Sequence, residues 1–284
     1  MLGTSQMSAS NSKFHDLQQL PQFPAIATKV LRVLSHDEIT AREIANFIRA
    51  DAALASGLLS LANSSLYHAR EHINSLQQAL TMLGMDELKR FVVTFSAKSC
   101  FQTAMRLDLL RAIWRHSLAC ALVSEELSVA CSPSQSRGDQ AYTAGLLHNI
   151  GRLGLFVVHP QEYADLLTGA ALGADLLALE REAFGVDHCE AGRWLAERWG
   201  LPEEVRVAAA EHHNPLSSGE FTLQDLVRVA VLLTNTLGFD VTVARRALNM
   251  QQIRASLPQV AQYRFDPEPD LMKQRINEKL DAFD

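Results

Sequence analysis

The chain has 284 residues and a formal net charge of −6 at pH 7, and 48% of its residues are hydrophobic while 20% are charged. This balance is typical of a globular protein with a buried core, and net acidity disfavours general binding of nucleic acid or anionic lipid. No run is long and apolar enough to span a bilayer, and the polar first residues lack the apolar core of a signal peptide. We therefore expect a cytoplasmic protein that does not bind membranes and whose residues 1–16 form a flexible start.

Leu and Ala dominate the composition, and apolar residues recur at helical spacing along almost the whole chain. The first apolar stripes are Ile26, Val30, Val33 and Leu34, then Ile44, Phe47 and Ile48, then Leu54, Leu58 and Leu61, and then Leu76, Leu80 and Leu83. Further helices are predicted over residues 88–101, 113–130, 141–157, 162–167, 176–184, 189–199, 203–212, 223–237 and 271–283. No strand-like alternation persists, so the pattern predicts an all-α fold.

Small and polar residues predict where these helices begin and end. Asn74-Ser75 is a suitable helix cap, and Gly84 can end the helix that follows it. Residues 131–138, rich in Ser with one Pro and one Gly, give the strongest loop signal in the chain. Gly145, Gly151 and Gly154 lie inside the predicted helix over 141–157 and indicate either close helix packing or a break near Gly151.

The side chains best suited to chemistry are histidines. His116, His148, His188, His212 and His213 each lie in or beside a predicted core helix, where imidazoles from several helices can converge on a metal. His212 and His213 are adjacent, so on a continuing helix they would point about 100° apart. They can share one site only if the helix ends there, as Pro215 indicates. The alternative is that the histidines are hydrogen-bonded core residues without a metal.

The four cysteines form no Cys-x-x-Cys pair. Cys100, Cys120, Cys131 and Cys189 are interpreted as buried thiols in a reducing compartment rather than as disulfides or a zinc knuckle.

A series of motifs in a fixed order resembles one known family. They are Leu20-Pro21-Gln22-Phe23-Pro24, Asp51, Leu61-Ala62-Asn63-Ser64-Ser65-Leu66-Tyr67, Ile73-Asn74-Ser75-Leu76, Ala79-Leu80-Thr81-Met82-Leu83-Gly84, Trp114-Arg115-His116-Ser117, residues 142–152 (Tyr142 to Arg152), Glu182, Phe184, Gly185, His188, Trp199-Gly200-Leu201-Pro202 and His212-His213-Asn214-Pro215. Together they resemble the HDOD family, the HD-related output domain of bacterial signalling proteins. The resemblance runs from about residue 17 to residue 237.

The resemblance implies a helical N-terminal subdomain packed on an HD-like helical core. The implied HDOD domain covers residues 17–237, with the N-terminal part over about 17–110 and the HD-like core over 111–237. Residues 238–284 would then form a C-terminal helical extension.

The HD-like core is similar to metal-dependent phosphohydrolases and cyclic-dinucleotide phosphodiesterases. The resemblance implies a metal site at His116, His148, Asn149, His188, His212, His213 and, with a less firm placement, Asn235. In the enzymes the residue at Asn149 is an aspartate that holds the metal, and the residue near Asn235 is also an aspartate. Both carboxylates are therefore amides here, and an amide is uncharged and a weaker ligand.

From this change we expect a non-catalytic regulatory output module that binds a partner protein or a small ligand in a vestigial metal site. No cofactor is expected, although the histidines could retain a divalent metal. The alternative is an active metal-dependent phosphohydrolase or phosphodiesterase that recruits other acids, for which Glu182, Asp187, Glu190 and Glu211 are near enough in sequence.

A third hypothesis, binding of nucleic acid, depends on a basic stretch that also contains acidic residues. Its cations are Lys89, Arg90, Lys98, Arg106, Arg111 and Arg115. No pattern of stacking aromatics accompanies these cations, so a solvated helix face is the preferred interpretation.

Overall fold

The computed structural model describes residues 13–36, 40–69, 71–131, 135–241 and 248–283, and within these ranges it contains helices and no strand. The helices are η1 (Asp16–Gln19), α2 (Ala25–His36), α3 (Ala41–Ala50), α4 (Ala52–Ala62), η2 (Ser65–Tyr67), α5 (Leu76–Ser99), η3 (Gln102–Ala104), α6 (Asp108–Cys131), α7 (Gln135–Leu147), α8 (Ile150–Val158), α9 (Pro160–Gly169), α10 (Leu176–Phe184), α11 (His188–Arg198), α12 (Glu203–Glu211), α13 (Leu223–Thr234), the π-helical turn η4 (Asn235–Phe239), α14 (Met250–Ala255), α15 (Gln259–Arg264) and α16 (Pro269–Phe283). The predicted all-α class is confirmed.

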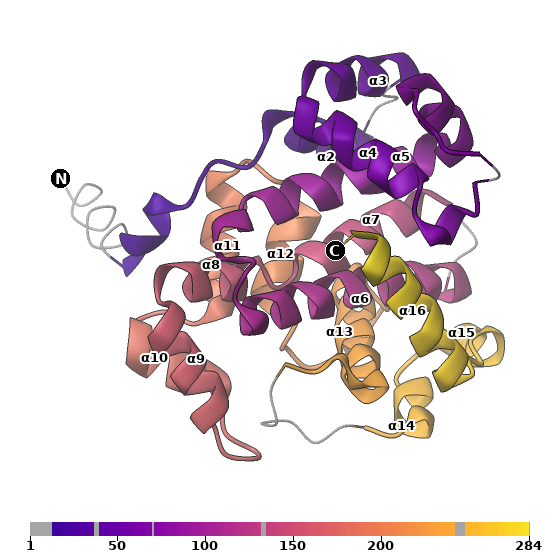
Figure 1. The fold of residues 1–284 in the computed structure, drawn as a ribbon. Helices are drawn as coiled ribbons and strands as arrows, with labels where there is room; N and C mark the ends of the chain where they lie inside the picture. Colours follow the sequence, from indigo (N-terminus) through magenta and orange to yellow (C-terminus); the bar gives the residue numbers. More distant parts are fainter. Residues whose placement is uncertain (1–12, 37–39, 70, 132–134, 242–247, 284) are drawn as a thin grey trace.

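The helices form an N-terminal group that packs on a larger core (Figure 1). Helices α2 to α5 make the N-terminal group, and α2 and α5 contact α7 of the core. Within the core, α6 packs along α7 and α13, while α11 packs against both α8 and α12. Buried side chains such as Phe91, Trp114 and Tyr142 join the two groups into one continuous apolar cluster. This arrangement is the helical subdomain on an HD-like core that the sequence motifs predict.

Local sequence signals explain several helix boundaries. Ser75 accepts a hydrogen bond from the backbone N–H of Gln77 and caps α5, as predicted. Gly84 has φ +75°, so the backbone leaves helical geometry there before the helix resumes. The loop predicted over residues 131–138 is wrong at its end, because α7 begins at Gln135. Residues 132–134 lie outside the described residues.

The predicted helix over residues 141–157 is divided at His148 and Asn149. Helix α7 ends at Leu147 and α8 begins at Ile150, so the break falls two residues before Gly151. Gly151 also lies directly against the first turn of α11, with its Cα too close to the backbone of His188 for any side chain. The sequence left a break and close packing as alternatives, and both occur. The break leaves His148 and Asn149 at a helix junction instead of inside a helix.

The N-terminal segment lies across the core helices. The ring of Phe14 stacks on Trp194 with 5.1 Å between ring centroids, and Asp16 pairs with His159 at 3.3 Å. Leu17 is 2% exposed. Phe14 and Asp16 thus make contacts with the core although they belong to the start predicted to be flexible over residues 1–16, and residues 1–12 lie outside the described residues.

Basic residues of the predicted cationic stretch connect α5 and α6 to the C-terminal helix. Lys98 donates to the backbone carbonyl of Phe283, and Arg115 pairs with Asp281. Arg90 is largely buried and pairs with Glu125 at 2.5 Å, with Glu87 and with Asp139. These cations pair with acceptors of the same chain. Much of the basic stretch therefore has a structural role.

No disulfide joins the four cysteines, all of which lie in described residues. Among the described helices, no single one has the length and apolar character to cross a membrane; the pair Arg42–Ala50 and Ala52–Ala62 meets both conditions only when its two members, bent by 113°, are counted together.

Candidate functional site

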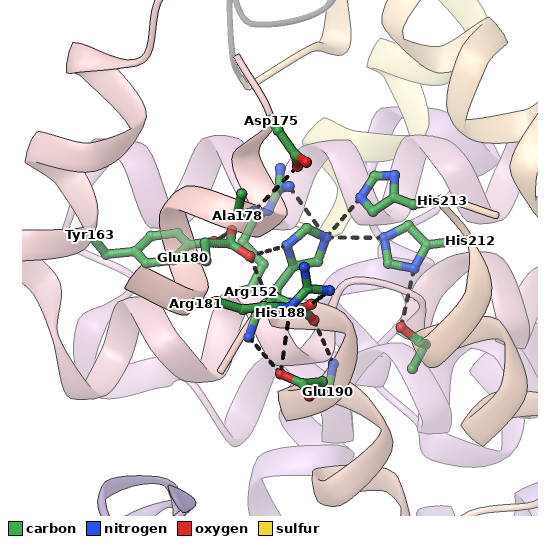
Figure 2. A network of polar contacts seen from close by, with 12 residues as sticks. Arg152, Tyr163, Asp175, Ala178, Glu180, Arg181, His188, Glu190, His212 and His213 are labelled. Carbon is green, nitrogen blue, oxygen red and sulfur yellow. Dashed lines mark hydrogen bonds and ion pairs between the residues drawn. The ribbon is translucent and has the colours of Figure 1, made fainter. Parts of the chain in front are cut away.

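Five histidines from different helices meet in the interior of the core. His116 comes from the middle of α6, His148 from the α7–α8 junction, His188 from the first position of α11, and His212 and His213 from the end of α12. Centroids of neighbouring rings are 4.2–5.5 Å apart. Helix α12 ends at Glu211, and this ending allows both adjacent histidines to reach His188, as the sequence predicts (Figure 2).

Backbone and carboxylate acceptors set the tautomer of four of these rings. The Nδ1 atoms of His116 and His148 lie 3.0 Å and 2.6 Å from the carbonyl oxygens of Phe239 and Gly145. The Nδ1 of His212 lies 3.2 Å from the Ala208 carbonyl. A carbonyl oxygen can only accept, so each Nδ1 carries the proton. In the neutral ring the lone pair is then on Nε2, the same tautomer as in metal sites where an outer acceptor orients each histidine.

The cluster favours neutral imidazoles. Burial, followed by the neighbouring His212 and His116, holds the pKa of His148 well below its ordinary value. Burial, followed by His213 and His188, does the same to the pKa of His212. Each ring disfavours a proton on the next because like charges would lie a few ångströms apart in a buried site. Neutral imidazole is the form that binds transition metals.

His188 is held by a buried acid that the sequence interpretation did not identify as part of the site. Glu180, on α10, accepts from both the backbone N–H and the Nδ1–H of His188, at 2.8 Å and 2.6 Å. Tyr163 of α9 donates to the other oxygen of Glu180 (Figure 2). The Nη2 of Arg152 approaches His188 Nε2 at 3.4 Å. Burial raises the pKa of Glu180, and the Arg152 guanidinium opposes that shift.

Asn149 and Asn235, the amides at positions where the resemblance implies carboxylates, both line the cavity beside the histidines. Asn149 is 2% exposed and Asn235 begins the π-helical turn after α13. Both line a cavity of ≈ 160 Å³ together with His116, His148 and His212. Within the described part of the chain, the Oδ1 atoms of both amides lack a hydrogen-bond partner. A self-satisfied polar core would pair these oxygens, so this observation weighs against the interpretation of the cluster as a hydrogen-bonded plug.

The four acids suggested as recruits for a hydrolase lie elsewhere. Asp187 caps α11 and pairs with Arg181, Glu190 completes that capping box, Glu182 is exposed on α10, and Glu211 lines a different cavity. None of the four lines the cavity beside the histidines.

Two acids that the sequence interpretation missed do line this cavity. They are Asp175 and Asp240, and Asp175 also caps α10 by accepting from the backbone N–H of Ala178.

A divalent metal, which the family resemblance implies, is compatible with the residues present. Ring nitrogens of His188 and His212 lie 3.3 Å apart, and those of His188 and His213 lie 2.8 Å apart. Two Nε2 lone pairs, such as those of His188 and His212, cannot hydrogen bond each other, but one cation can accept both. Imidazole suits zinc, iron, nickel and copper, whereas magnesium and calcium prefer carboxylates and water. The donor set therefore fits a borderline metal and does not fit a hard one.

Fold and site together define a class: an all-helical protein with a histidine cluster where the sequence resemblance implies a metal site. The profile of the HDOD domain matches residues 20–215, more than half of the chain. The chain belongs to the HDOD family.

Known relatives agree with this assignment at the level of fold. An HDOD domain protein of unknown function from Geobacter sulfurreducens has a TM-score of 0.67 at 21% identity and covers 96% of each chain. A protein provisionally named a signal transduction protein, from Marinobacter aquaeolei VT8, has a TM-score of 0.73 at 20% identity, covering 100% of this chain and 67% of that one. One provisionally named a metal-dependent phosphohydrolase, from Shewanella amazonensis SB2B, has a TM-score of 0.60 at 18% identity and covers 100% of both.

An uncharacterized protein of Treponema pallidum (strain Nichols) is 26% identical over 204 residues, which are 70% of this chain. The matched part is 38% of that protein's length, so the chain spans well under half of this relative.

Proposed function

We propose that the protein is a non-catalytic regulatory module of bacterial signal transduction, in which the histidine cavity binds a ligand without converting it. The observation that carries the proposal is the pair of amides at the cavity, the buried Asn149 and the half-buried Asn235, where the family resemblance implies metal-binding carboxylates in the hydrolases. A hydrolytic metal must lower the pKa of its bound water from 15.7 to about 7 and hold that water in line. Neutral amides supply neither the charge nor a proton acceptor for that task.

A borderline divalent metal is the ligand class that the cavity supports best. Four Nδ1 atoms are tied to acceptors, which places the lone pair of each neutral ring on Nε2, and the two amide oxygens of the cavity have no hydrogen-bond partner among the described residues. The bound state would fix the relative positions of α6, α8, α11 and α12, because each contributes to the cluster or its support. A partner protein that contacts these helices could then distinguish the bound form from the free form.

The proposal is tested by elemental mass spectrometry on protein purified without added metal, with phosphodiesterase and phosphatase assays on the same sample in Mn²⁺ and Fe²⁺. We expect near-stoichiometric borderline metal and no turnover. Turnover that follows the metal content would overturn the non-catalytic assignment. No metal together with no turnover would leave a regulatory module whose cavity binds another ligand, and a partner pull-down would follow.

An active phosphohydrolase is the second candidate, and Asp175 and Asp240 at the cavity favour it. Under this alternative one of these acids would replace the missing carboxylates. Asp175→Asn and Asp240→Asn should then abolish any activity observed in the parent, whereas Glu182→Gln, on the exposed face of α10, should not.

Restoring one carboxylate should strengthen metal binding. Asn149→Asp adds a negative charge beside His148 and replaces the amide nitrogen with a second ligand oxygen, so we expect divalent metal affinity to rise by roughly tenfold or more. The measurement is titration of chelator-treated protein with Mn²⁺ and Zn²⁺. Asn46→Asp adds the same charge on the exposed face of α3 and should leave affinity unchanged. Equal affinity in Asn149→Asp and the parent would show that the metal site is not at this junction.

A further inference from the structure

A cysteine lies at the His188 corner of the cluster. Cys189 is the second residue of α11, follows His188 directly and is 7% exposed. Its Sγ and one ring nitrogen from each of His188, His212 and His213 all lie within 4.8 Å of one another. The residues that the resemblance implies as ligands are histidines and carboxylates, and this thiol is additional to them.

The distances in this corner suit a tetrahedral ion. For zinc, with Zn–N of about 2.0–2.1 Å, two nitrogen ligands of a tetrahedron lie about 3.4 Å apart. The nitrogens of His188 are already 3.3 Å and 2.8 Å from those of His212 and His213. With Zn–S of about 2.3 Å, the sulfur would lie roughly 3.6 Å from each nitrogen. The four ligand atoms lie within 4.8 Å of one another in this structure, so small side-chain rotations would bring the sulfur to that distance.

Charge balance also favours a thiolate in this corner. Glu180 and Arg152 are both buried beside His188 and carry opposite charges, so they contribute no net charge to the site. The amides of Asn149 and Asn235 are neutral. Beside the carboxylates of Asp175 and Asp240, which line the adjoining cavity, a thiolate would place an anion directly in this corner to offset a divalent ion. The N-terminal end of the eleven-residue helix α11, where Cys189 lies, stabilises negative charge and hence the thiolate.

We propose that Cys189 is a thiolate ligand which, with His188, His212 and His213, forms a three-histidine, one-cysteine site. This inference rests on the metal binding proposed above and assigns four ligands at the His188 corner of the cluster, next to the cavity that His148 and Asn149 line. A sulfur ligand makes the site selective for zinc, cobalt and similar ions over magnesium and manganese. The thiol proton passes to solvent when the metal binds.

Cobalt(II) tests this assignment because its spectrum reports sulfur coordination without any assay of activity. The full chain is stripped of metal with a chelator and titrated with Co²⁺. We expect a near-ultraviolet thiolate-to-cobalt charge-transfer band together with the intense visible bands of a tetrahedral ion. Cys189→Ser should lose the charge-transfer band and bind Co²⁺ at least about tenfold more weakly. Cys131→Ser, a matched change at the end of α6 outside the cluster, should keep both.

A second measurement needs no variant and is therefore independent of whether Cys189→Ser folds. X-ray absorption at the zinc edge of the zinc-loaded parent should show one sulfur neighbour at about 2.3 Å beside nitrogen neighbours. Bound metal with no sulfur neighbour and no charge-transfer band would overturn the assignment of Cys189 while leaving metal binding in place. Failure to bind Co²⁺ or Zn²⁺ would overturn it as well. Phosphodiester turnover would contradict the proposed non-catalytic function without affecting this ligand assignment.

Discussion

Replacing Glu180 with alanine is expected to lower the free energy of unfolding by about 3–5 kcal/mol, the usual range when one member of a buried charged group is removed. Glu180 is 0% exposed, although glutamate is almost never fully buried unless it is paired. The change can be measured by urea unfolding followed by circular dichroism.

The size of this effect follows from the number of groups that Glu180 satisfies. It accepts hydrogen bonds from the backbone N–H and Nδ1–H of His188 and from the hydroxyl of Tyr163. All three donors are buried, and each loses its acceptor in the alanine variant. Arg152, which is 7% exposed, loses the anion beside it and becomes an uncompensated buried charge. Glu180→Gln keeps the shape of the side chain but not its charge, so we expect an intermediate loss.

Glu182→Ala is the matched control. It removes the same side chain two residues later on α10, where the residue is exposed, and should change stability by less than about 0.5 kcal/mol. A loss of less than about 1 kcal/mol in Glu180→Ala would show that the contacts around His188 contribute little. In that case Glu180 would not be the group that holds the His188 ring with its Nε2 toward His212 and His213.

The position of Glu180 illustrates what sequence reasoning could and could not find. Five histidines were assigned to one site through a family resemblance, because spacing along the chain does not show that α6, α11 and α12 meet. Glu180 had no such signal: it lies on a separate helix and is one of several acids in 175–190. A possible indication was its place on the side of α10 that carries Leu176, which is also buried. Helical periodicity alone would not distinguish this buried face of α10 from a solvent-exposed face that carries one apolar residue.

The fold was more accessible, because helical periodicity and caps are local properties. The loop predicted through Gly138 was wrong because tertiary packing overrides local propensity there. Serine and glycine disfavour helix, yet Gly138 lies against α6, where a side chain in its place would come within 4.0 Å of Ser128 and Glu125. Packing on an already formed helix stabilises a helix start that the residues alone do not favour.

Gly151 gives the second large effect, because this glycine sets how closely two helices approach beneath the histidine cluster. Gly151→Ala is expected to cost about 3 kcal/mol or more in unfolding free energy, at or beyond the upper end of ordinary overpacking. A Cβ at this position would lie 1.9 Å from the carbonyl oxygen of His188 and 2.3 Å from the amide nitrogen of Gly192. Both are backbone atoms of α11, so no side-chain rotation can relieve the overlap, and α8 and α11 must separate.

Gly169→Ala is the control that separates this overlap from the general effect of adding a methyl group. Gly169 is in α9 with nothing within 4 Å of the position a Cβ would take, so alanine there should be neutral or stabilising by up to about 1 kcal/mol.

Because α11 begins at His188, the movement forced by Gly151→Ala also displaces the ring that contacts His212, His213 and Arg152. We therefore expect weaker Co²⁺ binding in any folded fraction of this variant. Parent-like stability and Co²⁺ binding in Gly151→Ala would mean that the α8–α11 contact is looser than described and does not position His188.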